Sequence, residues 1–211
     1  MLRYIYGSQL DHHPKLRDTM FRDRADQFHT RLGWDVSVSE NGEERDQYDG
    51  PRTLYVIWET EAGQHGGSMR FLPTTGPTMI NDHFLPLLEG YPMQNDKIME
   101  CTRFCLARNA APRVSAALML GGAELGLGFR LSFSVGVFDA RMVRIYSRLG
   151  WAPMILGSSG EGREAVSAGL WAFSEPRAHA LCEKASIPRG LSRLWFHRAM
   201  AERPQRLAQI A

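Results

Sequence analysis

The chain has 211 residues, 44% of them hydrophobic, and its 25 Lys and Arg residues against 23 Asp and Glu residues leave a formal net charge of +2. This length supports the core of a single domain, which we expect to span residues 1–211. The near balance of charge argues against nucleic acid or a membrane surface as the main partner and favours small-molecule substrates.

The first half of the chain is predicted to contain a strand, a long helix, a polar loop and a hairpin. An initial proline and apolar residues spaced by four predict a helix over 14–32. Turn residues and clustered acids predict an ordered or partly mobile loop over 34–51. Two β-favouring runs at 54–59 and 67–72, separated by a turn-rich stretch, predict a hairpin that follows a first strand over 2–6.

The second half alternates between helical and strand patterns. These patterns predict helices over 79–88, 115–127, 140–149, 176–185 and 191–201, and strands over 98–107, 131–137 and 166–173. The alternation indicates an α/β fold in which helices cover a mixed sheet. Amphipathic spacing on the 140–149 helix predicts four core contacts: Met142, Ile145, Tyr146 and Leu149.

The predicted strand over 98–107 carries two charges, Glu100 and Arg103, among apolar neighbours. An isolated buried charge is very costly, so each must be paired, hydrated or part of a functional site. Residues three apart on a regular strand point to opposite faces. Either only one of the two side chains faces a site, or a bulge redirects them. Glu100 is then a candidate general base or one half of a structural ion pair.

Other charged residues have both functional and structural interpretations. Asp46 and Asp49 can hold a cationic ligand, although acidic loops usually form solvated surface. Arg24 and Arg70 can bind a carboxylate in the bidentate geometry that arginine favours, or they can be ion-paired scaffold.

Two aromatic residues, Phe28 and Trp34, can stack on an adenine or face a sulfonium. Packing of the helix against the core is an equally good interpretation. The three cysteines and seven histidines show no metal-ligand spacing, so we expect no metal site and a reducing compartment. The short polar N-terminus and the lack of a membrane-length apolar run predict a soluble cytoplasmic protein.

Several other patterns are weak. The serines of Gly157-Ser158-Ser159-Gly160 lack the glycine spacing of a nucleophile elbow, and Gly126-Leu127-Gly128 lacks the third glycine of a dinucleotide loop. A set of C-terminal arginines suggests a nucleic-acid surface, but we favour a solvated helix face because the chain is nearly neutral. These are Arg189, Arg193, Arg198, Arg203 and Arg206.

Taken together, the order and spacing of these separate features resemble the acyl-homoserine-lactone synthases of bacterial quorum sensing. The matching positions are Arg24, Phe28, Trp34, Asp46, Asp49, Arg70 within Met69-Arg70-Phe71-Leu72-Pro73-Thr74, and Glu100-x-x-Arg103-Phe104. The resemblance extends to Arg148-Leu149-Gly150-Trp151. It implies a GNAT-like three-layer α-β-α sandwich with a splayed central sheet, and it makes a bulge in the 98–107 strand a specific expectation.

The resemblance also implies the site. Arg24, Phe28 and Trp34 would shape a pocket for S-adenosylmethionine, a substrate here and not a cofactor, and Glu100 would be the base. A supporting charge network would comprise Asp46, Asp49, Arg70 and Arg103. The other substrate would be an acyl thioester of coenzyme A or of acyl carrier protein, and no other cofactor is expected.

The acyl pocket that the resemblance implies would be formed by Phe104, Phe138, Met142 and Tyr146. Members that make 3-oxo-acyl signals often carry a threonine just before the helix of Met142, where this chain has Phe138. We therefore expect a short, branched or aromatic acyl group. The alternatives are a GNAT-like N-acyltransferase for another amine, disfavoured because the Arg/Gln-x-x-Gly-x-Gly/Ala loop is absent from the sequence, and a nucleic-acid-binding regulatory module.

Overall fold

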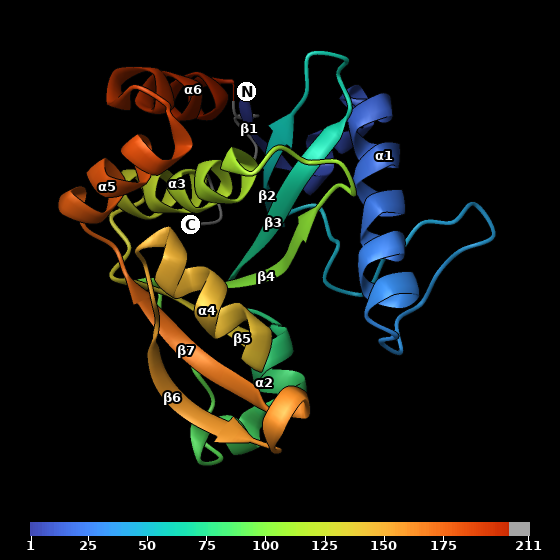
Figure 1. Ribbon diagram of the computed structural model, residues 1–211, viewed down its shortest axis with the longest axis vertical. Coiled ribbons are helices and arrows are strands. Elements are labelled where there is room, and N and C mark those ends of the chain that lie inside the picture. The colour runs from blue at the N-terminus through green and yellow to red at the C-terminus, as the bar shows by residue number, and fades with distance from the viewer. Residues whose placement is uncertain (203–211) are drawn as a thin grey trace.

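The computed structural model describes residues 1–202, and at Arg163 the main chain only. Its centre is a mixed sheet in the order β1-β2-β3-β4-β5-β7-β6 (Figure 1). The strands are β1 (Leu2–Tyr6), β2 (Leu54–Glu59), β3 (His65–Pro73), β4 (Ile98–Leu106), β5 (Phe133–Asp139), β6 (Met154–Ser159) and β7 (Val166–Ala172). The predicted hairpin is confirmed as the antiparallel pair β2 and β3.

The sheet splays open between its two middle strands. β4 and β5 are parallel and pair only from Ile98 to Glu100, opposite Phe133 to Val135. Beyond this short ladder the strands diverge, which confirms the predicted splayed sheet. Gly136 sits at the point of divergence, where a Cβ atom would lie 2.8 Å from the carbonyl oxygen of Cys101. Glycine is therefore required where the two backbones approach most closely.

Helices cover both faces of the sheet, as the predicted three-layer arrangement requires (Figure 1). One face carries α1 (Pro14–Ala25) and, near β7 and β6, α2 (Met79–His83) with the 3₁₀ helix η3 (Leu85–Leu88). The other carries α3 (Arg113–Gly128), α4 (Ala140–Leu149), α5 (Glu175–Ala185) and α6 (Arg189–Ala201).

The alternation of side chains along the strands supplies a separate core on each face. On β2, Val56 packs in the cluster under α3, whereas Tyr55 and Ile57 pack with Met20 and Phe21 of α1. All of these are almost completely buried. Because complete burial of one such side chain stabilises a fold by about 1.5–3 kcal/mol, the two layers hold β2 firmly between them.

The structure differs from the sequence predictions in several places, among them two short 3₁₀ helices that were not predicted, η1 (Gly7–His12) and η4 (Gly162–Glu164). The helix predicted over 14–32 changes at Asp26 into a π-helical segment, η2 (Asp26–Arg31), and the one predicted over 79–88 is interrupted between α2 and η3. β6 was not predicted; it is an edge strand with exposed apolar residues and no alternating pattern. The prediction that Ile145 is a core contact is wrong, since its side chain is 38% exposed.

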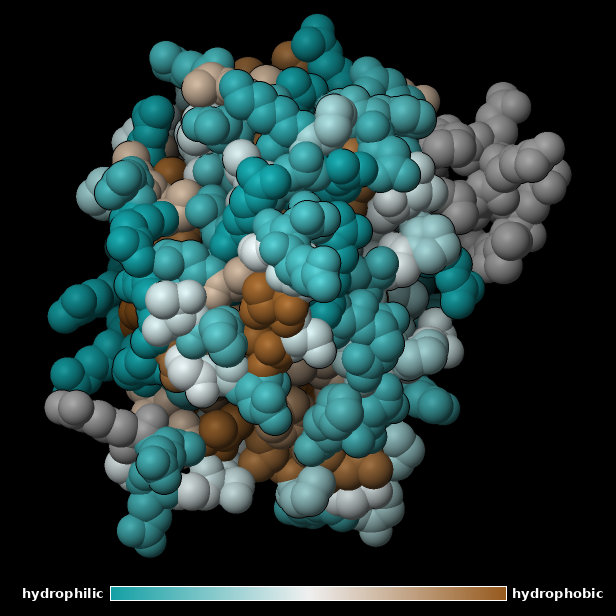
Figure 2. All heavy atoms as spheres, turned by 90° about the vertical axis from the view of Figure 1, so that its right-hand side faces the viewer, coloured by the Kyte–Doolittle hydropathy of each residue, from teal (hydrophilic) through white to brown (hydrophobic). Residues whose placement is uncertain are grey.

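Residues 34–51, all of them described, contain only an isolated bridge between Val38 and Glu44. Figure 2 shows the side of the molecule formed by α1 and this loop, which is mostly hydrophilic, with hydrophobic side chains gathered near its centre and lower end. Among the described residues, no helix has the length and apolar composition needed to cross a membrane.

Candidate active site

A bulge in β4 brings its two charges to one face of the sheet. The pairing of β3 with β4 shifts register between Ser68 and Arg70, so that Arg103 is an extra residue in its strand. Arg103 has a φ of 52°, the left-handed conformation that non-glycine residues rarely adopt. The predicted bulge is confirmed, and through it Arg103 reaches the same face as Glu100 and Thr102.

Arg24 forms one end of a buried ion-pair network. Its Nε donates to Oε2 of Glu44 over 2.6 Å, and its two Nη atoms donate to the carboxylate of Asp49 over 2.8 and 2.9 Å. Burial opposes the ionisation of Asp49, but the charge and hydrogen bonds of Arg24 outweigh it and lower the pKa of that carboxyl. Arg24 and Glu44 are both buried.

The network continues through Arg70 and Arg103, which share Asp46. The Nη2 atom of Arg70 donates to Oδ2 of Asp46 over 3.0 Å, and Nη2 of Arg103 donates to the same oxygen over 2.8 Å. Arg103 also donates to Oε1 of Glu44 over 2.9 Å. The guanidinium groups of Arg24, Arg70 and Arg103 thus face the carboxylates of Glu44, Asp46 and Asp49, and the charges balance within the network.

Glu100 is fully buried and has no arginine partner in this network. Its Oε1 accepts the main-chain N–H of Ile80 over 2.6 Å, and its Oε2 accepts that of Met79 over 2.9 Å. Burial raises the pKa of Glu100 to about 7, although these two hydrogen bonds and the charge of Arg70 lower it in part. A carboxyl that titrates near neutral pH suits general base catalysis.

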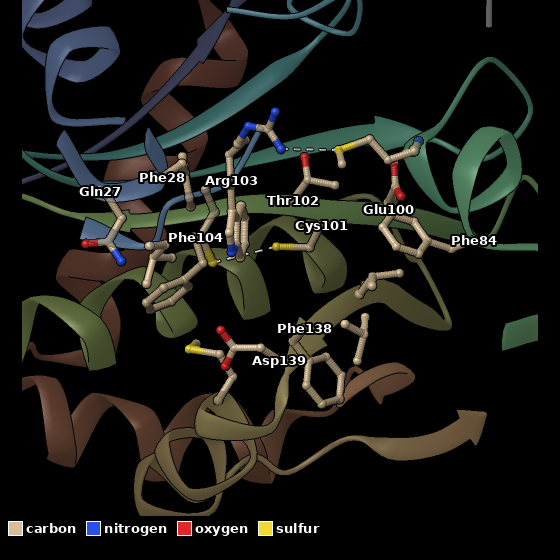
Figure 3. Close-up of a pocket in the computed structure, with 18 of the residues that line it drawn as sticks. Gln27, Phe28, Phe84, Glu100, Cys101, Thr102, Arg103, Phe104, Phe138 and Asp139 are labelled. Carbon is tan, nitrogen blue, oxygen red and sulfur yellow. Dashed lines mark hydrogen bonds between the residues drawn. The ribbon is translucent and has the colours of Figure 1, made fainter. Parts of the chain in front are cut away.

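A cavity of about 1290 Å³ passes through the opening between β4 and β5. On the α1 side it is lined by Phe28 and Trp34, whose rings stack on each other with centroids 5.1 Å apart, and by residues of the 34–51 loop. Glu100, Thr102 and Arg103 lie along its wall (Figure 3). The cavity therefore joins a charged, aromatic region to the space on the other side of the sheet.

On the α3 side the cavity is bounded by aromatic rings. Tyr146 of α4 lies edge-on to Phe138, Phe104 and Trp171, with ring centroids 5.4, 6.4 and 4.9 Å away. Met142 also lines this end. Most of these side chains are largely buried and carry no formal charge, so this end suits an apolar group.

The structure brings most of the predicted site residues together, but one of them, Arg24, has a different position from the one predicted. Arg24 does not line the cavity; its donors are taken up by Glu44 and Asp49, so it belongs to the charge network and not to a substrate pocket wall. Phe28 and Trp34 do line the cavity. Trp34 is also 39% exposed at the surface.

Sequence reasoning missed three residues here. Glu44 links Arg24 to Arg103, and its only sequence signal was its place in an acidic loop. Asp82 accepts a hydrogen bond from the hydroxyl of Tyr48 over 2.8 Å, which fastens the loop to α2. Met79 contacts two arginines through its sulfur, and nothing in the sequence distinguishes it.

The C-terminal arginines within the described residues, Arg189, Arg193 and Arg198, do not line this cavity. Arg189 and Arg193 both pair with Glu175, over 2.8 and 2.7 Å. Arg203 and Arg206 lie outside the described residues. These pairs agree with the solvated helix face favoured above.

Residues 8–181 match the sequence model of the family described as autoinducer synthase. An acyl-homoserine-lactone synthase of Rhizobium etli is 37% identical over 179 residues, 81% of this chain and 84% of the relative. A solved structure of a CoA-dependent acyl-homoserine lactone synthase, BjaI, with SAM and isopentyl-CoA, superimposes with a TM-score of 0.80 at 21% identity, covering 89% of this chain and 90% of that one.

A structure assigned as an N-acetyltransferase, from Lactobacillus plantarum, aligns with a TM-score of 0.56 at 13% identity, over 82% of this chain and 99% of that chain. These structural likenesses confirm the predicted GNAT-like fold. The family match covers most of the chain, and it coincides with a splayed sheet and a cavity lined by several of the predicted residues, among them Phe28, Trp34, Glu100 and Arg103. The chain therefore belongs to the autoinducer synthase family, the family of the acyl-homoserine-lactone synthases.

Proposed function

We propose that this protein makes an N-acyl-homoserine lactone from S-adenosylmethionine and an acyl thioester. The observation that carries the proposal is the continuous cavity through the splayed sheet, with Glu100 on its wall. Two dissimilar substrates must meet for this reaction, and the cavity has two dissimilar ends. S-adenosylmethionine is consumed as a substrate, so the proposed reaction requires no further cofactor.

S-adenosylmethionine would bind on the α1 side. Its sulfonium and adenine suit the face of Trp34 that is not stacked on Phe28, because a cation is attracted to the negative face of an aromatic ring. Phe28 supports Trp34 from the other side, and Arg103 lies over the Phe28 ring. The ion-paired arginines behind them hold the wall of this region rigid, since each guanidinium is fixed by carboxylates from the 34–51 loop. A rigid wall favours one reactive orientation of the substrate.

Glu100 would take the proton from the substrate's α-ammonium, directly or through one water. An α-amino group has a reference pKa of about 7.7–8.0, close to the pKa of about 7 of Glu100. Proton transfer between groups so closely matched is nearly isoenergetic at neutral pH. The free amine then attacks the thioester carbonyl, and the C–S bond of the thioester breaks. The second proton of the attacking nitrogen passes to the departing thiolate, which leaves as a free thiol, and Glu100 releases the first proton to solvent.

Lactone formation follows from the charge on the substrate. The carboxylate oxygen attacks the γ-carbon, and the bond from that carbon to sulfur breaks with its electron pair on sulfur. The sulfonium thereby becomes the neutral thioether of methylthioadenosine, so the leaving group is activated before the reaction begins. The protein needs only to hold the carboxylate near the γ-carbon.

The acyl chain would occupy the α3 side. Phe138 and Tyr146 pack edge-to-face with centroids 5.4 Å apart and narrow this end of the cavity, while Met142 lines it. Phe138 stands where 3-oxo-acyl synthases often carry a threonine, and its side chain has no hydroxyl. The expected acyl group is therefore short, branched or aromatic, carried on coenzyme A or on acyl carrier protein.

A donor panel tests the proposal. The protein is incubated with S-adenosylmethionine and short, branched, aryl, long and 3-oxo acyl thioesters, each on both carriers, and lactone and methylthioadenosine are measured by mass spectrometry. We expect both products, with the highest turnover for a short, branched or aryl donor. Lactone made best from long 3-oxo donors would refute the acyl assignment alone. Acylation of an added amine without methylthioadenosine release would indicate the alternative N-acyltransferase.

A further inference from the structure

Met79 is placed where the buried charge network meets the cavity. Its sulfur accepts a contact from Nη2 of Arg70 over 3.4 Å and one from Nη1 of Arg103 over 3.5 Å; the dashed line from Arg103 in Figure 3 marks the second. The side chain is half-buried and lines the cavity. A thioether sulfur is a weak hydrogen-bond acceptor.

These two contacts differ from the other hydrogen bonds of the two guanidinium groups, which also lie over the rings of Tyr48 and Phe28. Arg70 pairs in addition with Asp49, its Nη1 lying 3.0 Å from Oδ1. The remaining N–H donors of Arg70 and Arg103 that have partners among residues 1–202 donate to oxygen: to Thr102, Asp46 and Glu44. Donors buried without a strong acceptor cost free energy. The N–H groups of Arg70 and Arg103 that contact the Met79 sulfur are therefore the donors with the weakest acceptor in an otherwise well-paired network, and both belong to positively charged groups.

The position of Met79 also fixes what lies beside these donors. Its main-chain N–H donates to Oε2 of Glu100 over 2.9 Å, so one residue contacts both the base and the two guanidinium groups. In an α-amino acid the ammonium and the carboxylate are attached to the same carbon. A substrate whose ammonium approaches Glu100 must place its carboxylate within a few ångströms, close to the Met79 sulfur.

We propose that the Met79 side chain is a displaceable acceptor that occupies the carboxylate subsite of S-adenosylmethionine, and that Nη2 of Arg70 and Nη1 of Arg103 bind this carboxylate when the sulfur moves aside. The inference rests on the proposed function and deepens it. A carboxylate forms charge-assisted hydrogen bonds that are about twice as strong as neutral ones, so the exchange of sulfur for carboxylate favours binding. Met79 is a long, flexible side chain that can change rotamer without moving the main chain that holds Glu100.

Two near-isosteric substitutions make opposite predictions. Met79→Gln introduces a stronger acceptor that competes with the substrate carboxylate, so the affinity for S-adenosylmethionine should fall about tenfold, or about 1.4 kcal/mol. Met79→Leu removes the competing acceptor, so the affinity should rise about threefold. Decarboxylated S-adenosylmethionine, which lacks only the carboxylate, should bind both variants within about twofold of the original protein.

The measurement is isothermal titration calorimetry of the whole protein without an acyl donor, after circular dichroism has shown that each variant is folded. Met20→Leu is the matched control, because Met20 is a buried residue of α1 that does not line the cavity, and it should leave both affinities unchanged. Equal shifts for the two ligands in either variant, or no preference of the original protein for the carboxylate, would overturn the subsite while leaving lactone synthesis standing. If neither ligand binds the original protein, the proposed function fails with it.

Discussion

The titration of Glu100 should control the rate of amide formation. Its pKa is raised to about 7 by burial, against the opposing effect of the N–H groups of Ile80 and Met79 and the charge of Arg70. At saturating S-adenosylmethionine, turnover should therefore rise with pH and level off above an apparent pKa near 7. The rising part of this pH–rate profile should therefore lie well above the usual pKa of a glutamate, which is about 4.3.

Glu100→Gln removes the base while preserving its shape. General base catalysis contributes about 10²–10⁴-fold, so turnover should fall by that factor, equivalent to about 2.7–5.4 kcal/mol in the barrier. One of the two main-chain N–H donors would then face the amide –NH₂ group, at a cost of about 1–3 kcal/mol. Since small proteins are typically stable by about 5–15 kcal/mol, the variant should fold with a lowered melting temperature.

The same pKa shift predicts how stability depends on pH. A pKa of 4.5 in the unfolded chain and of about 7 in the fold means that the folded state binds the proton more tightly. The associated stability, about 3 kcal/mol, is present below pH 4.5 and is lost as pH rises through about 7. In Glu100→Gln this component of the pH dependence should disappear from urea unfolding curves.

The assay combines turnover with substrate binding. Lactone and methylthioadenosine are quantified from pH 5.5 to about 9, a range that brackets the titration of both the base and the amine, and calorimetry measures the affinity for S-adenosylmethionine. In Glu100→Gln we expect the affinity for S-adenosylmethionine to be largely retained and the rise in turnover near pH 7 to be lost. A variant that keeps more than about a tenth of the original turnover, and whose turnover still rises near pH 7, would refute the role of Glu100 as base. Loss of folding would instead support a purely structural role.

Three further substitutions follow from the geometry. Glu44→Gln removes a buried carboxylate shared by Arg24 and Arg103, and it should lower the free energy of unfolding by about 3–5 kcal/mol, measured by urea denaturation; a loss below about 1 kcal/mol would contradict the network. Phe138→Ala should shift donor preference about tenfold towards longer acyl chains in a competition assay, and an unchanged preference would remove Phe138 from the acyl pocket. Gly136→Ala places a methyl group 2.8 Å from a main-chain carbonyl oxygen of β4. The KM for the acyl thioester should therefore rise, while the affinity for S-adenosylmethionine should stay the same. A weaker affinity for S-adenosylmethionine with an unchanged KM for the acyl thioester would show that the acyl donor does not pass between β4 and β5.

Much of the fold could be predicted from local patterns, because most strands and helices carry clear periodicity. The bulge in β4 shows what pattern alone leaves open. Charges at Glu100 and Arg103 required either a bulge or two separate roles, and the family resemblance selected the bulge. The structure adds its physical form, a left-handed φ at Arg103 and a register shift opposite Arg70.

The features that sequence reasoning missed depend on contacts between distant segments. Glu44 becomes central only because the 34–51 loop folds back over α1. The loop contains several acidic residues, and the sequence does not show which of them is buried in the folded protein. Ile145 follows an amphipathic pattern, yet its helix covers an open cleft and not a closed core, so the residue stays exposed. The interruption after α2, by contrast, has a local cause: Pro86 lies in the first turn of η3 and has no main-chain N–H, so a regular helix cannot continue through it.

In the proposed reaction, two substrates react in one cavity, and methylthioadenosine is then released from one of them. The most direct test is the stoichiometry of a single reaction with S-adenosylmethionine and the best donor found in the panel. We expect one lactone, one methylthioadenosine and one free thiol for each acyl thioester consumed. Thiol release without an equal amount of methylthioadenosine, or methylthioadenosine without lactone, would contradict it.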